Sequence, residues 1–129
     1  MRTRRGFTLF EATAALAIVG ITAVAALGAV GAELRTTARA RRAIEAQALA
    51  TSRLDFMALL SNQELQALPD TVAKGAFAAP LNDYTWKATS SALSATQGLY
   101  GVDLTINWPN GAYVVRTYMY RLPPLAAAR

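Results

Sequence analysis

The chain has 129 residues, of which 53% are hydrophobic and 16% charged, with a mean hydropathy of +0.23 and a formal charge of +5. This length supports one small domain with a single hydrophobic core. Because the sequence contains neither cysteine nor histidine, it excludes disulfides, thiol nucleophiles, histidine bases and conventional zinc sites.

The first six residues form a short basic leader that contains Arg2, Arg4 and Arg5 and ends at Gly6, just before the aromatic Phe7. Glycine lacks a side chain, so a protease can draw out the strand at this point with little steric penalty. We expect the arginines to hold the leader in the cytoplasm. Loss of the leader would lower the formal charge from +5 to +2. Much of the basicity therefore belongs to a precursor, and no nucleic-acid partner is indicated.

An apolar segment follows, with no charged residue from position 12 to 32. About 20 helical residues, each rising 1.5 Å, cross a hydrocarbon core of roughly 30 Å, so the segment can span a membrane. Glu11 lies at its start, and a carboxylate in hydrocarbon costs about 2.5–3.5 kcal/mol on insertion scales. Glu11 therefore implies a partner. A free amine on Phe7 would lie one helical turn away, and the positive end of the helix dipole also favours an acid there.

Two simpler interpretations of this segment stay open. A secretory signal peptide also starts with arginines, and residues 30–32 (Val-Gly-Ala) resemble its small-residue cleavage site. Against it, Glu11 interrupts the segment and the uncharged run exceeds the roughly 7–15 residues typical of such peptides. A plain single-pass anchor also fits the length.

Four arginines follow the apolar segment, at Arg35, Arg39, Arg41 and Arg42. They nearly balance the leader arginines, so charge counting alone does not orient the helix. They can pair with acidic groups of neighbouring subunits, contact phosphates at the outer membrane surface, or form a solvated basic face.

The basic leader, Gly6 before Phe7, the Thr-Leu pair that follows, and Glu11 ahead of an apolar helix together resemble the prepilin signature. This signature belongs to type IV pilins and to the pseudopilins of type II secretion. The resemblance implies that a membrane-embedded prepilin peptidase cuts after Gly6 and methylates the new amine of Phe7. It also implies that Glu11 meets the amine of a neighbouring subunit in a helical filament. The amino terminus would be cytoplasmic and the carboxyl-terminal part periplasmic.

Beyond the apolar segment, residues 33 to about 60 contain no glycine or proline, which predicts a continuing helix. One side of it is apolar at helical spacing and should carry the globular part; it comprises Ala46, Leu49, Ala50, Leu54, Phe56, Met57 and Leu60. The opposite side is polar and comprises Gln47, Thr51, Ser52 and Asp55. Arg53 lies near the middle of the apolar side. We expect its stem to pack there and its head to find a carboxylate or the sheet edge.

Ser61 and Glu64 have the spacing of a capping box, which predicts a short second helix ending near residue 68. Residues 69–83 are rich in turn-forming types and are predicted to be a loop.

Alternating apolar residues predict an antiparallel sheet in the last third, with strands over 84–93 and 99–108. Trp86 is expected in the core. The second strand directs Val102, Leu104, Ile106 and Trp108 to one face and Asp103, Thr105 and Asn107 to the other. A hairpin turn at Asn110-Gly111 would pair Trp108 with Tyr113, Ile106 with Val115 and Leu104 with Thr117.

The outer face of the last strand carries Val114, Arg116, Tyr118 and Tyr120, and it is a candidate subunit contact because tyrosine tolerates both water and burial. Residues 123–124 (Pro-Pro) are expected to end this strand.

No enzymatic arrangement is supported. A serine with a lysine base is the one remaining possibility, but Lys74 and Lys87 fall in a loop and a strand without a matching serine motif. Asp70 and Asp83 are too few and too scattered for a calcium site. We therefore expect no enzyme activity, no metal and no cofactor.

The expected fold is α+β and pilin-like, with a long amino-terminal helix packed on a small carboxyl-terminal antiparallel sheet. The expected organisation is a cleaved leader (1–6), a transmembrane and filament-core helix (7–32), an amphipathic helix with a short second helix (33–68), and a periplasmic sheet domain (69–129).

The resemblance is greatest to the I-type minor pseudopilin, and the lack of cysteine favours a pseudopilin because many type IV pilins close their carboxyl-terminal region with a disulfide. It implies a role at the tip of a periplasmic pseudopilus anchored in the inner membrane. The implied partners are the prepilin peptidase and other minor and major pseudopilins, joined through their amino-terminal helices.

The alternatives are a minor type IV pilin in adhesion, motility or DNA uptake, and a single-pass membrane-anchored binding module. The candidate assembly residues are Phe7 and Glu11, and the candidate subunit contacts are Arg39, Arg41, Arg42, Tyr118 and Tyr120.

Overall fold

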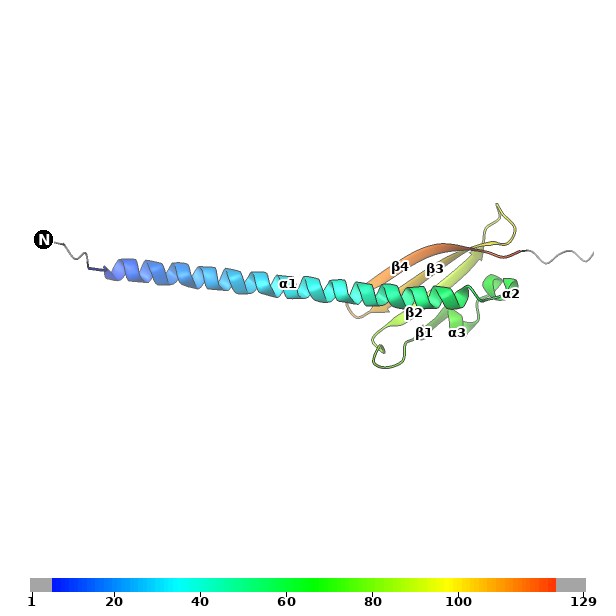
Figure 1. Ribbon diagram of the computed structural model, residues 1–129, viewed down its shortest axis with the longest axis horizontal. Helices are drawn as coiled ribbons and strands as arrows, with labels where there is room; N and C mark the ends of the chain where they lie inside the picture. Colours follow the sequence, from blue (N-terminus) through cyan, green and yellow to red (C-terminus); the bar gives the residue numbers. More distant parts are fainter. Residues whose placement is uncertain (1–5, 123–129) are drawn as a thin grey trace, which may run out of the picture. The chain divides into compact units, whose positions relative to one another are not determined.

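The computed structural model describes residues 6–122, with three helices followed by four strands (Figure 1). The long helix α1 covers Leu9–Met57 and is followed by a four-stranded antiparallel sheet. The expected α+β class, with a long amino-terminal helix and a small sheet, is confirmed. The chain divides into two compact units, one up to Ala40 and one from Arg41 onward, and α1 contributes to both.

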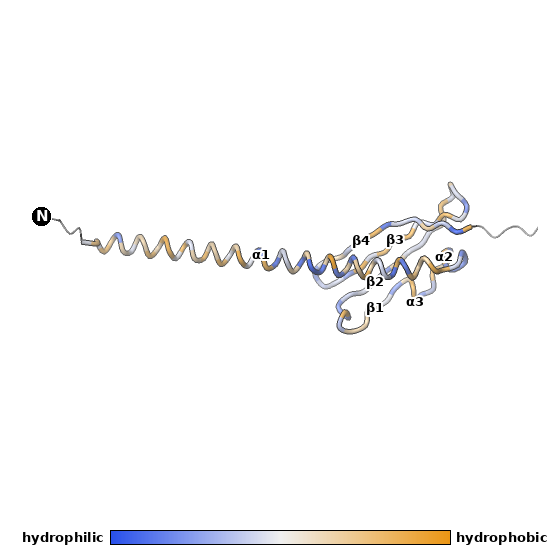
Figure 2. The backbone as a smooth tube through the Cα atoms, in the orientation of Figure 1, coloured by the Kyte–Doolittle hydropathy of each residue, from blue (hydrophilic) through white to orange (hydrophobic). Residues whose placement is uncertain are grey.

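The described part of the first unit covers residues 6–40, which contain the apolar segment of α1 and the first charged residues after it. No side chain in residues 6–40 is buried within the chain, although large apolar side chains such as Leu16 and Leu27 occur throughout. Figure 2 shows this stretch mostly in white and orange, the colours of neutral and hydrophobic residues. Among the described residues, α1 is the one helix long and apolar enough to cross a membrane, judged by length and composition. Such an exposed apolar surface requires lipid or other apolar partners.

In the second unit, the remainder of α1 packs on the sheet through a narrow apolar face. Ala46, Ala50 and Met57 are buried there. The prediction that Phe56 shares this face is wrong, because its side chain is 48% exposed. One residue turns an α-helix by about 100°, so Met57 at the centre of the buried face leaves its neighbour Phe56 on the flank.

The helix ends at Met57, slightly before the expected residue 60. Arg121, from the far end of the sheet, donates hydrogen bonds to the carbonyl oxygens of Ala58 and Leu60, the latter at 3.0 Å. The last carbonyls of a helix lack intrahelical partners, so a cation at this point satisfies them and suits the negative end of the dipole.

Helix α2 covers Asn62–Gln66 and starts with the predicted capping box. The Glu64 amide donates to the Ser61 hydroxyl at 3.4 Å, and the Ser61 amide donates to the Glu64 carboxylate at 2.8 Å. The bonding holds the pKa of Glu64 below its usual value, chiefly through the Ser61 backbone amide.

The expectation of a loop over 69–83 is partly wrong, because helix α3 (Asp70–Ala73) and strand β1 (Lys74–Ala76) lie within it. Gly75, which suggested a turn, is a strand residue opposite Trp86. A side chain at this position would collide with the Trp86 ring, so the glycine is needed for close approach. The Trp86 indole N–H donates to the Val72 carbonyl at 3.0 Å.

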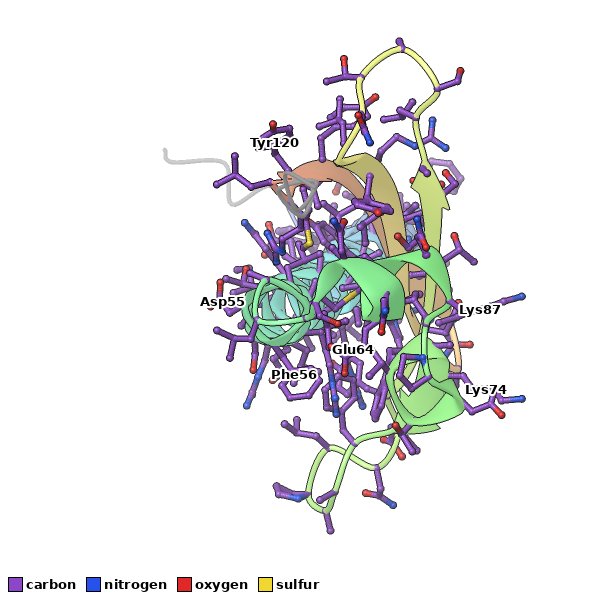
Figure 3. The ribbon with its side chains drawn as sticks, turned by 90° about the vertical axis from the view of Figure 1, so that its right-hand side faces the viewer. Asp55, Phe56, Glu64, Lys74, Lys87 and Tyr120 are labelled. Atoms are coloured by element: carbon purple, nitrogen blue, oxygen red, sulfur yellow. The ribbon has the colours of Figure 1, made fainter. Side chains whose placement is uncertain are left out.

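The sheet has the order β1-β2-β3-β4, with β2 at Thr85–Ala92, β3 at Leu99–Trp108 and β4 at Gly111–Tyr120. The predicted strands at 84–93 and 99–108 are confirmed within one residue. Every second side chain of β3 points into the core, and Val102, Leu104 and Ile106 are fully buried. Trp86 joins them as predicted. In Figure 3, α1 is seen nearly end-on, beside the sheet that its buried face covers.

The predicted hairpin register is wrong by two residues. The loop is Pro109-Asn110, and Trp108 pairs with Gly111, Ile106 with Tyr113, and Leu104 with Val115. Proline has a preset φ and no N–H to donate, so it fits the first turn position better than a paired strand. An Asn-Gly turn of the hairpin type needs positive φ at both residues, and neither Asn110 nor Gly111 has it. A shift of two keeps each side chain on its face, so the core was predicted correctly despite the register.

Candidate functional site

A capping box begins α1 and involves the carboxylate of Glu11. The Thr8 amide donates to Glu11 Oε2 at 3.2 Å, and the Glu11 amide donates to Thr8 Oγ1 at 3.2 Å. The Thr8 carbonyl accepts the first helical hydrogen bond, from Ala12 at 3.1 Å. This reciprocal arrangement satisfies two amides that a helix start would otherwise leave without partners. The Thr-x-x-Glu spacing of residues 8–11 could have predicted it.

The expectation that a free Phe7 amine lies one helical turn from Glu11 concerns the cleaved chain and stays a prediction; in the uncleaved chain, Phe7 lies just outside the helix. Gly6, Phe7 and Thr8 are not helical, because Thr8 is the cap and α1 starts at Leu9. Glu11 instead receives a bond from the amide of the residue next to Phe7. The Phe7 side chain is 84% exposed. The leader arginines Arg2, Arg4 and Arg5 lie outside the described residues.

Glu11 has hydrogen-bond donors in the described chain but no counter-charge there. The ion pairs within residues 6–122 involve other carboxylates. An amide satisfies a lone pair without neutralising the charge, so Glu11 can still accept a cation.

The candidate contact arginines differ in their surroundings. Arg39 is exposed on α1 and makes no ion pair with any described residue. Arg41 Nε lies 3.1 Å from Glu45 Oε1, and Arg42 Nη2 lies 3.6 Å from Asp83 Oδ2. The structure therefore gives Arg41 and Arg42 partners within their own chain.

Glu45 connects α1 to the start of β2. The Tyr84 hydroxyl donates to Glu45 Oε2 at 2.7 Å, and the Arg42 guanidinium lies 5.4 Å from the Tyr84 ring centroid. The bond from Tyr84, and then the bond from Arg41, lower the pKa of the Glu45 carboxyl. Burial, and then the bond to Glu45, raise the pKa of Tyr84. This cluster fixes the helix against the sheet.

The outer face of the sheet carries the two candidate contact tyrosines, and Tyr118 and Tyr120 are 62% and 52% exposed. Tyr118 stands opposite Gly101, and a Cβ on that glycine would lie 3.8 Å from the Tyr118 ring. Beside them, Arg116 binds Asp103 through two parallel bonds of 2.5 and 2.8 Å, which lower the pKa of Asp103. Tyr118 therefore covers a bare strand backbone as well as facing outward.

Within residues 6–122, Arg53 does not meet the carboxylate or sheet edge expected for it. Its guanidinium carbon lies 3.5 Å from the Trp86 ring centroid and 5.2 Å from that of Phe77. The expectation was wrong because the pairing of β1 with β2 brings two aromatic rings under α1, and the sequence alone does not reveal this.

Comparison with known proteins adds one match. Residues 1–27 match the family described as the prokaryotic N-terminal methylation motif. No curated protein and no solved structure matches the chain. The matched residues include Gly6, Phe7, Thr8 and Glu11, so the match covers the expected cleavage point and the capping box.

This motif implies processing by a prepilin peptidase and assembly with other pilins. The single apolar amino-terminal helix fits a membrane anchor in such a protein. Proteins of this kind are structural subunits and not an enzyme family. The methylation motif, the long amino-terminal helix and the antiparallel sheet together indicate a protein of the type IV pilin and pseudopilin kind.

Proposed function

We propose that this protein is a minor pseudopilin of a type II secretion system and that it helps to initiate or form the tip of the periplasmic pseudopilus. The observation that carries the proposal is the state of Glu11. Its carboxylate accepts a hydrogen bond from the Thr8 amide and has no counter-charge among the described residues. Glu11 also lies at the start of an apolar helix, within the methylation motif.

In this proposal, prepilin peptidase cuts between Gly6 and Phe7 and methylates the Phe7 amine. The apolar part of α1 anchors the subunit in the inner membrane, with its amino terminus in the cytoplasm and its sheet in the periplasm. Cleavage creates a cation at the same depth as the uncompensated carboxylate. An ammonium and a carboxylate about 4 Å apart attract by about 4 kcal/mol at an effective dielectric constant near 20. That is comparable with the insertion cost of about 2.5–3.5 kcal/mol for a lone charge.

An ion pair between Glu11 of one subunit and the Phe7 amine of another would favour assembled subunits over separate ones. The cap leaves the charge of Glu11 without a counter-charge among the described residues, and in this proposal the Phe7 amine of another subunit supplies it. Small residues along α1, including Gly20, Gly28 and Gly31, have open space around them, which allows another helix to approach closely.

The lack of cysteine supports a pseudopilin over a type IV pilin. The test is deletion of the gene in the native host, with complementation by the wild-type chain. We expect exported enzymes to accumulate in the periplasm of the deletion strain, while surface pili and twitching motility stay normal. Loss of pili with normal secretion would instead assign the protein to a type IV pilus.

A further inference from the structure

The guanidinium of Arg53 lies over an aromatic surface formed by Trp86 and Phe77. Its guanidinium carbon is 3.5 Å from the Trp86 ring centroid. Trp86 is itself fixed by its bond to the Val72 carbonyl, and Phe77 meets it edge-on with centroids 4.9 Å apart and ring planes at 61°. A guanidinium stacked in this way has its N–H groups in the plane of the fork, where they remain able to bind a carboxylate bidentately.

Arg53 differs from the other described arginines of the second unit in having no acceptor among the described residues. Arg41, Arg42 and Arg116 each pair with a carboxylate. Arg121 donates to backbone carbonyls. Burial lowers the pKa of Arg53, but an arginine keeps its proton in proteins, so the site is cationic.

Among the described residues, no carboxylate forms an ion pair with Arg53. Glu45, Asp83 and Asp103 are bound to other arginines, and Glu64 serves the α2 cap. Asp55 is two positions along the helix from Arg53, a spacing that places two side chains on different sides. Arg53 is thus a cation with no ion-pair partner among the described residues, and it is able to bind a carboxylate from another chain.

An exposed aromatic side chain adjoins this cation on α1. Phe56 is three positions after Arg53, so the two are neighbours on the helix surface. Figure 3 shows Phe56 on the flank of α1, and its side chain is 48% exposed. Arginine and aromatic residues are both enriched in protein interfaces.

We propose that Arg53, with Phe56 as an apolar anchor beside it, is the docking point for a carboxylate side chain of a second pilin-type subunit. The inference rests on the proposed function, since it assumes that the chain assembles with such subunits. Charge complementarity selects the partner group, because the guanidinium of Arg53 binds a planar anion bidentately. An Asp or Glu flanked by apolar residues would supply a carboxylate for Arg53 and an apolar contact for Phe56.

The test replaces Phe56 in the full-length protein with the photoreactive analogue p-benzoylphenylalanine and irradiates cells of the native host. We expect a cross-link to another subunit, identified by mass spectrometry as one that carries the methylation motif. Arg53→Gln should reduce the yield of this product roughly tenfold or more, since loss of a bidentate charged contact has an effect of that order. Arg53→Lys, which keeps the charge but loses the fork, should give an intermediate yield.

The matched control is Lys87→Gln, which removes an exposed cation from the sheet surface that faces away from α1 (Figure 3). We expect it to leave the cross-link unchanged. Thermal unfolding of each purified full-length variant in detergent shows whether it is folded. If Arg53→Gln unfolds at a lower temperature than the wild type, the Arg53→Lys variant, which keeps the positive charge, is used instead. A cross-link yield for Arg53→Lys equal to that of the wild type overturns the inference.

The outcomes separate this inference from the proposed function. An unchanged cross-link in folded Arg53→Gln, a cross-link to a protein without the motif, or none at all in a chain that still enters filaments overturns the docking site alone. If the wild-type chain never enters filaments and its deletion leaves secretion intact, the proposed function fails, and the docking site fails with it.

Discussion

The two units of the described chain use one helix in opposite ways. In residues 6–40, no side chain is buried within the chain, and none of the charged residues there forms an ion pair with another described residue. In residues 41–122, α1 buries Ala46, Ala50 and Met57 against the sheet, and three arginines have carboxylate partners. The second unit contains its own stabilising contacts, whereas the first depends on lipid or on other subunits.

The largest expected effect comes from separating the units. A chain of residues 41–129 should fold, unfold cooperatively and remain in the soluble fraction, because its core lies within the second unit. The full-length chain should require detergent. Fractionation and circular dichroism measure both properties, and an unfolded fragment would show that the second unit needs the first.

A matched pair of leucine substitutions compares the two environments. Leu104 is completely buried, so Leu104→Ala should lower the free energy of unfolding by about 2–5 kcal/mol. Leu16 is 74% exposed, so Leu16→Ala should change it by less than about 0.5 kcal/mol. Chemical denaturation of the full-length protein in detergent tests both. A comparable loss in Leu16→Ala would mean that the first unit contributes to the folded core.

The two capping boxes provide a smaller and more local comparison. Ser61→Ala should cost the second unit about 1 kcal/mol, the usual value for loss of a serine cap. Thr8→Ala should leave the unfolding of the second unit unchanged, since its cap lies in the first. Equal shifts in the thermal midpoint of the two variants would contradict the independence of the units.

The smallest effect is a dependence of stability on pH. The pKa of Glu45 is lowered in the folded state from an ordinary value of 4.5. A lowered pKa contributes stability that is complete above about pH 4.5 and is lost as the pH falls through the folded-state value. Thermal unfolding of residues 41–129 should therefore decline on acidification. Tyr84→Phe should decline less over this range, because it removes the main cause of the shift; an equal decline would exclude this bond as the cause.

Local patterns predicted the parts of the fold that depend on neighbouring residues. The long helix was predicted because residues 33–60 contain no glycine or proline, and β3 because its apolar residues alternate. The Ser61-Glu64 spacing predicted the α2 cap, and the same logic would have predicted the Thr8-Glu11 cap had it been applied there.

Contacts between distant segments account for the rest. Strand β1 has three residues and exists through its pairing with β2, so its own sequence suggested a loop. The Trp86 ring needs Gly75 beneath it, and both place an aromatic surface under Arg53. The hairpin register depended on Pro109, whose missing N–H outweighed the Asn-Gly signal. At the candidate site, the sequence predicted the prepilin motif around Gly6, Phe7 and Glu11, but it was not used to predict the capping box between Thr8 and Glu11.

The central claim is that Glu11 serves assembly and not processing or folding. The most direct measurement compares the wild-type chain with Glu11→Ala in the native host, by mass spectrometry of the amino terminus and by recovery in sheared filaments. We predict that both chains begin at N-methylated Phe7 and that Glu11→Ala is missing from the filaments. Recovery of Glu11→Ala at the wild-type level, or a wild-type chain that still begins at Met1, would contradict the claim.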